Sequence, residues 1–200
     1  MAEIRSDGTK ELIRTWASIA SGPYVPLRAD VSPSAIKRLL PRVFIISNED
    51  GIWKFRLAGT EFYSLYGREL TGLSFSAIWG TGYGLVERGI EHAASVCLPL
   101  IITSEAWSLE GVVGGETVVL PLRSSGGHAE VDRFIGLQSF PGIRPWWLAS
   151  KPFLQTTVGV VEVVGEKARS VAAAERAKGI PALRLVERQA KFRVLERVSR

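Results

Sequence analysis

The chain has 200 residues and a formal net charge of +5, with 46% hydrophobic and 22% charged residues. This composition is typical of a globular protein with enough apolar side chains for a core. Cys97 is the only cysteine, which excludes an intrachain disulfide and a zinc site built from several cysteines. The charged N-terminus lacks the apolar core of a signal peptide, and no apolar run approaches the roughly 20 residues of a membrane span. We therefore expect a cytoplasmic protein.

The positive charge is concentrated toward the C-terminus. Residues 151–200 contain eleven Lys and Arg against five Asp and Glu, whereas residues 1–150 contain fourteen against fifteen. The pI of about 9.6 therefore describes the C-terminal segment and not the nearly neutral remainder. For this reason we do not expect the folded part to bind nucleic acid.

Residues 9–20 predict a first helix, because apolar residues recur there at three- and four-residue spacing. The stripe consists of Leu12, Ile13, Trp16, Ile19 and Ala20. Asp7 or Thr9 is expected to cap the start of this helix. The stripe must lie against this domain or against a partner chain, so Leu12, Trp16 and Ile19 are interface candidates.

A short helix is expected at residues 33–40, followed by strands at 43–47 and 52–57 that a turn at 48–51 joins. The first strand is apolar on both faces, which indicates a sheet covered on both sides. Helices are expected at 61–66 and 83–95, then strands at about 100–109, 116–122 and 132–140. Gly114-Gly115 and residues 124–127 are predicted turns.

This order predicts an α+β domain with an antiparallel sheet. After Gly142 the pattern weakens, although residues 151–164 could form an edge strand and residues 166–178 a helix. Residues 183–198 mix helical and alternating signals, and their structure stays open.

Spaced motifs through the first 140 residues carry a family resemblance. They are Arg28-Ala29-Asp30, Pro33, Leu39-Leu40-Pro41, Arg56-Leu57-Ala58-Gly59-Thr60, residues 67–72 with Phe75 and Trp79, Glu116 with Leu120-Pro121-Leu122, and Ile135-Gly136. In this order they resemble a PAS-like domain family common in alphaproteobacteria, over residues 16–140. The resemblance implies a PAS fold: a five-stranded antiparallel sheet with central helices on one face and the N-terminal helix on the other.

The resemblance also implies a domain division and a function. Residues 1–22 are expected to form the N-terminal amphipathic helix, residues 23–142 the PAS-like domain, and residues 143–200 a basic extension. PAS domains hold a small molecule between sheet and helices, or dimerise through the outer sheet face. We expect a sensory or adaptor module in signal transduction, acting through protein–protein contacts as a homodimer with a signalling partner. The resemblance names no ligand.

Five residues are candidates for lining a ligand cavity: Arg56, Tyr66, Trp79, His92 and Trp107. Aromatic rings with one polar atom suit a small-molecule pocket, but the same rings serve equally as core packing. Arg56 either meets an acidic ligand group or is an exposed strand residue. His92 lies where haem-binding PAS domains place a ligand, yet its helical phase favours a surface histidine.

The sequence does not predict an enzyme. His92 and His128 are far apart, neither HExxH nor CxxC is present, and residues 80–84 lack the lysine of a phosphate-binding loop. Cys97 is expected to be a small buried residue. We predict no catalytic residue, no metal site and no cofactor.

Two features near the C-terminus leave alternatives open. Trp146 and Trp147 form an apolar cluster that either packs on the domain or anchors a partner. The basic tail could instead act as an electrostatic tether on nucleic acid or an anionic membrane, which is the alternative function. Because the tail is not clearly amphipathic, a solvated segment is the simpler interpretation, and we expect neither partner.

Overall fold

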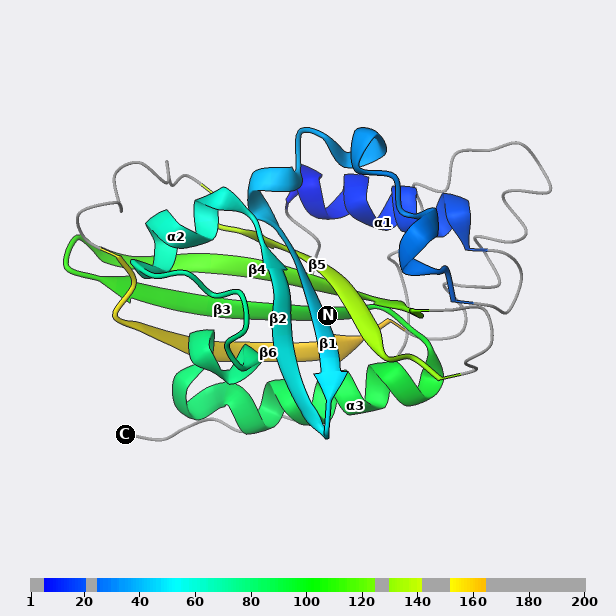
Figure 1. Ribbon diagram of the computed structural model, residues 1–200. Helices are drawn as coiled ribbons and strands as arrows, with labels where there is room; N and C mark the ends of the chain where they lie inside the picture. Colours follow the sequence, from blue (N-terminus) through cyan, green and yellow to red (C-terminus); the bar gives the residue numbers. More distant parts are fainter. Residues whose placement is uncertain (1–5, 21–24, 125–129, 142–151, 165–200) are drawn as a thin grey trace.

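The structure is a computed structural model that describes residues 6–20, 25–124, 130–141 and 152–164. One antiparallel sheet runs through it in the strand order β2-β1-β5-β4-β3-β6 (Figure 1). The strands are β1 (Val43–Glu49), β2 (Ile52–Ala58), β3 (Leu100–Ser108), β4 (Gly111–Leu122), β5 (Arg133–Ser139) and β6 (Gln155–Val163). The α-helices are α1 (Asp7–Ile19), α2 (Thr60–Tyr66) and α3 (Tyr83–Val96).

The predicted fold class is confirmed, with one strand more than the five expected. The sixth strand, β6, pairs antiparallel with β3 from Leu100 opposite Val163 to Trp107 opposite Gln155. It comes from the segment that the sequence assigned to the C-terminal extension, where an edge strand was considered. Two residues of this strand, Thr156 and Val163, are buried.

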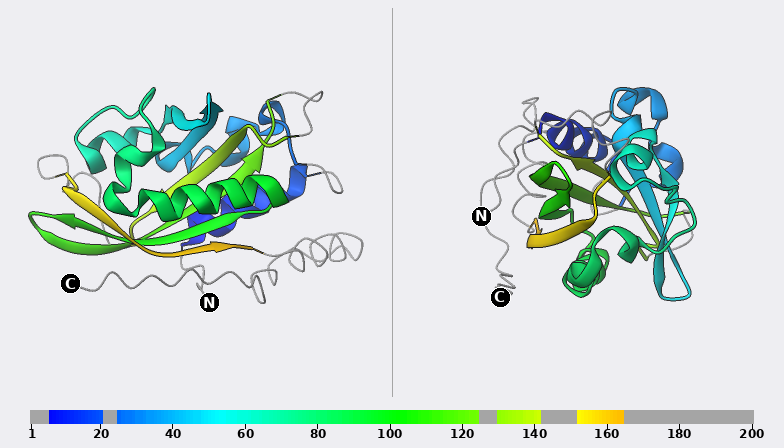
Figure 2. Two further views of the ribbon diagram at one scale, coloured as in Figure 1. Left: turned by 90° about the horizontal axis from the view of Figure 1, so that it is seen from below. Right: turned by 90° about the vertical axis from the view of Figure 1, so that its left-hand side faces the viewer.

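Helices pack on both faces of the sheet, as the two-sided apolar pattern of β1 predicts. On the face that we call inner, α2 and α3 contribute Phe62, Val86 and Ile90 to a core with Phe44 and Phe55 of the first two strands. On the outer face, Leu12 and Trp16 of α1 pack with Ile45 and Leu137, among others. Figure 2 shows these layers from below and from one side.

Some predicted boundaries and caps need correction. Ser6, rather than Asp7 or Thr9, is the N-cap of α1, since its side chain accepts a hydrogen bond from the Thr9 backbone N–H at 3.4 Å. The short helix expected at 33–40 is instead a 3-10 turn at Pro33–Ile36 followed by another at Leu40–Arg42. Cys97 was expected to be buried but is only partly buried; it is the C-cap of α3, in a left-handed conformation with φ 56°.

Gly114-Gly115 was predicted as a turn, but it lies inside β4; the turn of this hairpin is Leu109-Glu110. Gly115 is needed for close packing and not for chain reversal. A Cβ atom built there would lie 2.4 Å from the ring of Phe140. The predicted turn at 124–127, like the helix predicted at 166–178 and residues 183–198, falls largely or wholly outside the described residues.

Two glycines of the family motifs are explained by close approach. A Cβ atom on Gly59 would lie 2.3 Å from the carbonyl oxygens of Leu40 and Pro41, so two motifs meet there backbone to backbone. A Cβ atom on Gly136 would lie 2.1 Å from the Phe44 ring, which crosses the strand at that point. Glycine at these positions lets neighbouring segments pack without a gap.

Candidate functional site

A group of polar side chains lies on the inner face, where the sheet is otherwise apolar. Its members, which we call the polar cluster, are Tyr66 of α2, Ser104 of β3, Thr117 of β4, Gln138 of β5 and Thr156 of β6. The four strand residues are all buried. Because side chains alternate along a strand, each occupies a position in phase with the core. Thr117, for example, is two residues from the buried Val119.

One hydrogen bond joins the helix to the sheet within this cluster. The Tyr66 hydroxyl donates to Oε1 of Gln138 at 2.9 Å. Burial raises the pKa of the Tyr66 hydroxyl well above its ordinary value, and hydrogen bonding with Gln138 and Thr156 offsets this only in part. The hydroxyl is therefore a neutral donor throughout the physiological pH range.

Several atoms of the cluster are buried without a hydrogen-bond partner among the described residues. They are Ser104 Oγ, Thr117 Oγ1 and Gln138 Nε2; the indole Nε1 of Trp79 is in the same position elsewhere in the inner core. A buried polar group left unpaired costs about 1–3 kcal/mol. These unpartnered atoms of the cluster lie on the adjacent strands β3, β4 and β5.

Aromatic rings border the cluster. Tyr66 stacks on Phe62 with 6.2 Å between ring centroids and meets Phe153 edge-on at 5.9 Å. The ring centroids of Phe140 and Phe153 are 4.7 Å apart. This arrangement of apolar walls with a few polar groups is typical of sites for small organic molecules.

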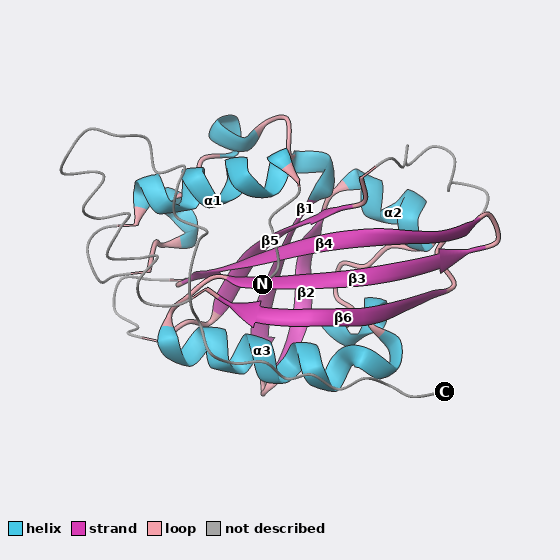
Figure 3. Cartoon of the chain, turned by 180° about the vertical axis from the view of Figure 1, so that it is seen from behind, coloured by secondary structure: helices cyan, strands magenta, loops and turns pink. Residues whose placement is uncertain are grey.

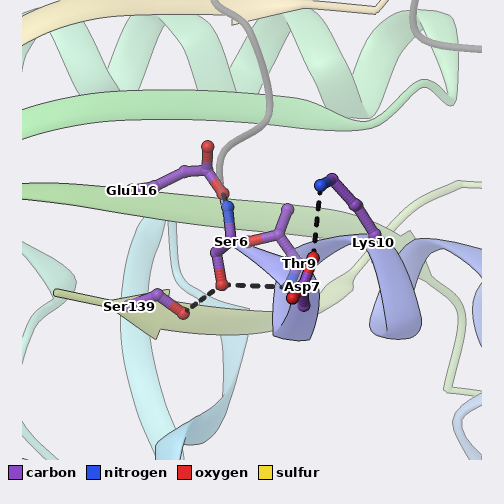
Figure 4. Close-up of polar contacts among 6 residues, drawn as sticks. All are labelled: Ser6, Asp7, Thr9, Lys10, Glu116 and Ser139. Carbon is purple, nitrogen blue, oxygen red and sulfur yellow. Dashed lines mark hydrogen bonds and ion pairs between the residues drawn. The ribbon is translucent and has the colours of Figure 1, made fainter. Parts of the chain in front are cut away.

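The outer side of the same strands holds the start of α1 (Figure 4). Ser6 donates its backbone N–H to Glu116 Oε1 at 3.2 Å and its hydroxyl to Ser139 Oγ at 2.9 Å. Glu116 and Ser139 are buried and lie opposite each other on β4 and β5. We call Ser6, Glu116 and Ser139 the helix anchor.

The polar cluster and the helix anchor are adjacent on the two strands. Thr117 pairs with Gln138 on the inner side, and the next pair, Glu116 with Ser139, faces outward. Since consecutive strand residues point to opposite faces, a displacement of either strand moves both pairs together. The polar cluster and the helix anchor therefore share the same two strands.

Two of the five predicted ligand-cavity residues lie in the inner core, and the other three lie elsewhere. Tyr66 belongs to the polar cluster, and Trp79 is fully buried in the inner core. Arg56 is exposed on β2 and forms an ion pair with Glu49 at 3.1 Å. His92 is partly exposed on α3, and Trp107 lies in β3 with 47% of its surface exposed.

The predicted interface residues lie mostly within the domain itself. Leu12 and Trp16 are buried against the outer sheet face, and the Trp16 indole donates to the Pro121 carbonyl at 2.8 Å. Ile19 is partly buried beside them. Trp146 and Trp147 lie outside the described residues.

Four members of the polar cluster were missed in the sequence. Ser104, Thr117, Gln138 and Thr156 each sit at the core-facing phase of a strand whose neighbours at two-residue spacing are apolar. A polar residue in that phase is the signal that would have identified them.

The architecture described above is an α+β fold with one antiparallel sheet and helices on both of its faces. A family model described as a PAS domain matches residues 4–139, and the chain belongs to this family. None of the curated proteins compared with the chain matches it.

Several solved structures are similar to this chain. A light-oxygen-voltage domain studied with a flavin analogue is 14% identical to this chain. The match covers 58% of this chain and 87% of that domain, with a TM-score of 0.43. An RNA-binding light-oxygen-voltage receptor is 13% identical, with 80% of this chain and 43% of its own covered and a TM-score of 0.44. The Rhodobacter sphaeroides LOV protein is 12% identical, with 87% and 94% covered and a TM-score of 0.42.

Two further observations concern the described residues. None of their helices is long and apolar enough to span a membrane. Nor do their His, Cys, Asp and Glu side chains form a group of three that could hold a metal ion.

Proposed function

We propose that this chain is a sensory PAS module in which the polar cluster holds a small polar molecule and the state of the cluster is passed to α1. Family membership supports the general role. The observation that carries the specific proposal is the pairing of Thr117 with Gln138 directly beside Glu116 with Ser139. One pair faces the core and the other holds Ser6 at the start of α1.

The chemistry of the cluster indicates the class of ligand. Hydroxyl groups of Ser104 and Thr117 can both donate and accept, while Gln138 Nε2 only donates. A small molecule with at least one acceptor atom and an apolar body would match these groups and the neighbouring rings. The proposed module carries out no reaction, because the cluster contains neither a nucleophile with an adjacent base nor a group of metal ligands.

The output is proposed to reach a protein partner, and self-association to a homodimer is part of this proposal. Because Leu12 and Trp16 are buried inside the domain, a partner would contact other side chains of α1. Alternatively, it would bind the apolar stripe after α1 has left the sheet. Both routes depend on how firmly the helix anchor holds α1.

Two measurements test the proposal. Native mass spectrometry of freshly purified protein should show a bound compound that is lost on denaturation and is absent from a Gln138→Leu variant. Hydrogen exchange of the α1 amides should then become several-fold faster in Gln138→Leu than in the original chain. Tyr63→Leu is the matched control, because Tyr63 is exposed on α2 and belongs to neither group. Exchange of α1 that is equal in all three proteins would contradict the proposed coupling.

A further inference from the structure

The outer face of β3, β4 and β6 is only partly covered by the described residues. Figure 3 shows these three strands facing the viewer, with α1 above them. Trp107 and Val112 pair across β3 and β4 and are 47% and 44% exposed, and Val160 of β6 is 41% exposed. We call these three residues, together with Glu105 and Glu162, the open strip.

The open strip is acidic as well as apolar. β3, β4 and β6 contain no Lys or Arg, and Glu105 and Glu162 belong to the strip, whereas Glu116 is buried in the helix anchor. The hairpin turn between β3 and β4 adds Glu110. Glu105 is exposed and lies between Thr157 and Gly114, so no cation sits beside it on the neighbouring strands.

The end of β6 directs the chain toward this same face. Val164 packs against the outer core that contains Leu12 and Ile101, and its backbone N–H donates to Pro99 at 2.9 Å. The 36 residues that follow contain ten Lys and Arg and four Glu. They also contain apolar residues, among them Leu183, Leu185 and Phe192.

The following segment is long enough to reach the whole strip. β6 has nine residues and so spans about 30 Å at roughly 3.3 Å per residue. Even at the helical rise of about 1.5 Å per residue, 36 residues would cover about 54 Å. Opposite charges held at short range on one molecule attract without the entropic cost of bringing two molecules together.

We propose that residues 165–200 bind the open strip of their own chain, with basic side chains against Glu105 and Glu162 and apolar side chains against Trp107, Val112 and Val160. The bound segment covers Trp107, Val112 and Val160, and the two glutamates offset part of its net charge of +6 (ten Lys and Arg against four Glu). A nucleic acid, a membrane or a protein partner would then have to displace it from the sheet.

Carbodiimide cross-linking of the full chain tests this directly, because it joins amines to carboxylates that are already in contact. An equal mixture of ¹⁵N-labelled and unlabelled protein distinguishes links within one chain from links between chains. We expect links within one chain from Lys167, Lys178 or Lys191 to Glu105 or Glu162. In 1 M NaCl, where the Debye length is about 3 Å, we expect at least a five-fold loss.

Variants separate specific binding from chance contact. Trp107→Ser should reduce the links to Glu162 several-fold, whereas Tyr63→Ser, which removes an exposed ring on α2, should leave them unchanged. Glu91 on α3 is exposed and serves as an internal reference. The proposal would be overturned if the links joined different chains or came only from Lys151 or the N-terminal amine. It would also be overturned if links to Glu91 were as frequent, or if no links formed.

Discussion

The inner core has two halves of different character. Beneath β1 and β2 it is hydrocarbon: Phe44 meets Phe55 and Phe62 at 5.8 Å and Phe75 at 5.4 Å between ring centroids. Beneath β3, β4, β5 and β6 it contains the polar cluster with its unpartnered atoms. The first half stabilises the fold by burial alone, whereas the second gives up stability at positions that apolar residues could fill. Such local loss of stability is typical of functional sites.

The largest effect is expected in the hydrocarbon half. Phe44→Ala removes a ring that contacts three others and covers Gly136, and it should lower the free energy of unfolding by about 3–5 kcal/mol. Urea denaturation followed by circular dichroism measures the change. Tyr63→Ala, at an exposed position, should stay within about 0.5 kcal/mol. Similar losses for both variants would contradict the packing described here.

A smaller loss of unfolding free energy is expected at Tyr66, where α2 contacts the polar cluster. Tyr66→Phe keeps the ring stacked on Phe62 but removes the donor to Gln138, so it should cost about 1–2 kcal/mol. Thermal unfolding would show this as a decrease of roughly 3–6 °C. An unchanged midpoint would mean that the hydrogen bond contributes nothing to the fold.

The opposite sign is expected inside the polar cluster. Thr117→Val preserves shape and removes a buried hydroxyl that has no partner among the described residues. In protein refolded from denaturant, and thereby freed of small molecules, it should raise the free energy of unfolding by about 1 kcal/mol. The same variant should bind any co-purified compound more weakly. A loss of stability in the refolded protein would show that the hydroxyl is satisfied by the chain itself.

The smallest effect concerns the half-buried Glu61 on α2. Burial raises the pKa of its carboxyl group, and Arg42, with 3.9 Å between the charged groups, offsets this only in part. The folded state therefore binds the proton more tightly than the unfolded state, so stability falls as the pH rises from the ordinary value of about 4.5 through the raised one. Glu61→Gln should remove this slope, with a change of about 1–2 °C in Tm. Melting curves between pH 4 and 7 decide it; equal slopes would contradict the assignment.

The sequence predicted the sheet well because its signals are local. The apolar run of β1, the alternation in β2, the turn at Asp50-Gly51 and the apolar stripe of α1 depend on neighbouring residues alone. The observed bounds differ from the predicted ones by only a few positions. The start of β4 was missed because two glycines usually mark a turn. Only the approach of Phe140, 25 residues further on, explains Gly115.

The candidate site was harder to predict, because its residues are joined by register and not by sequence. Tyr66 and Trp79 were proposed because an aromatic ring with one polar atom suits a small-molecule pocket. Gln138 and Thr117 become neighbours only once β4 pairs with β5, and Thr156 only once β6 is added to the sheet. Trp107 was misplaced for a related reason: the phase of β3 directs it outward, away from the core.

A double-mutant cycle between the two sides of the sheet tests the central claim most directly. Gln138→Leu changes the polar cluster, and Ser6→Ala removes the hydroxyl that binds Ser139 and caps α1. If the strands couple the two sides of the sheet, the loss of unfolding free energy in the double variant should differ from the sum of the two single losses by at least about 0.5 kcal/mol. Additivity within about 0.3 kcal/mol would show that the core and α1 are independent, and the proposed route between them would be wrong.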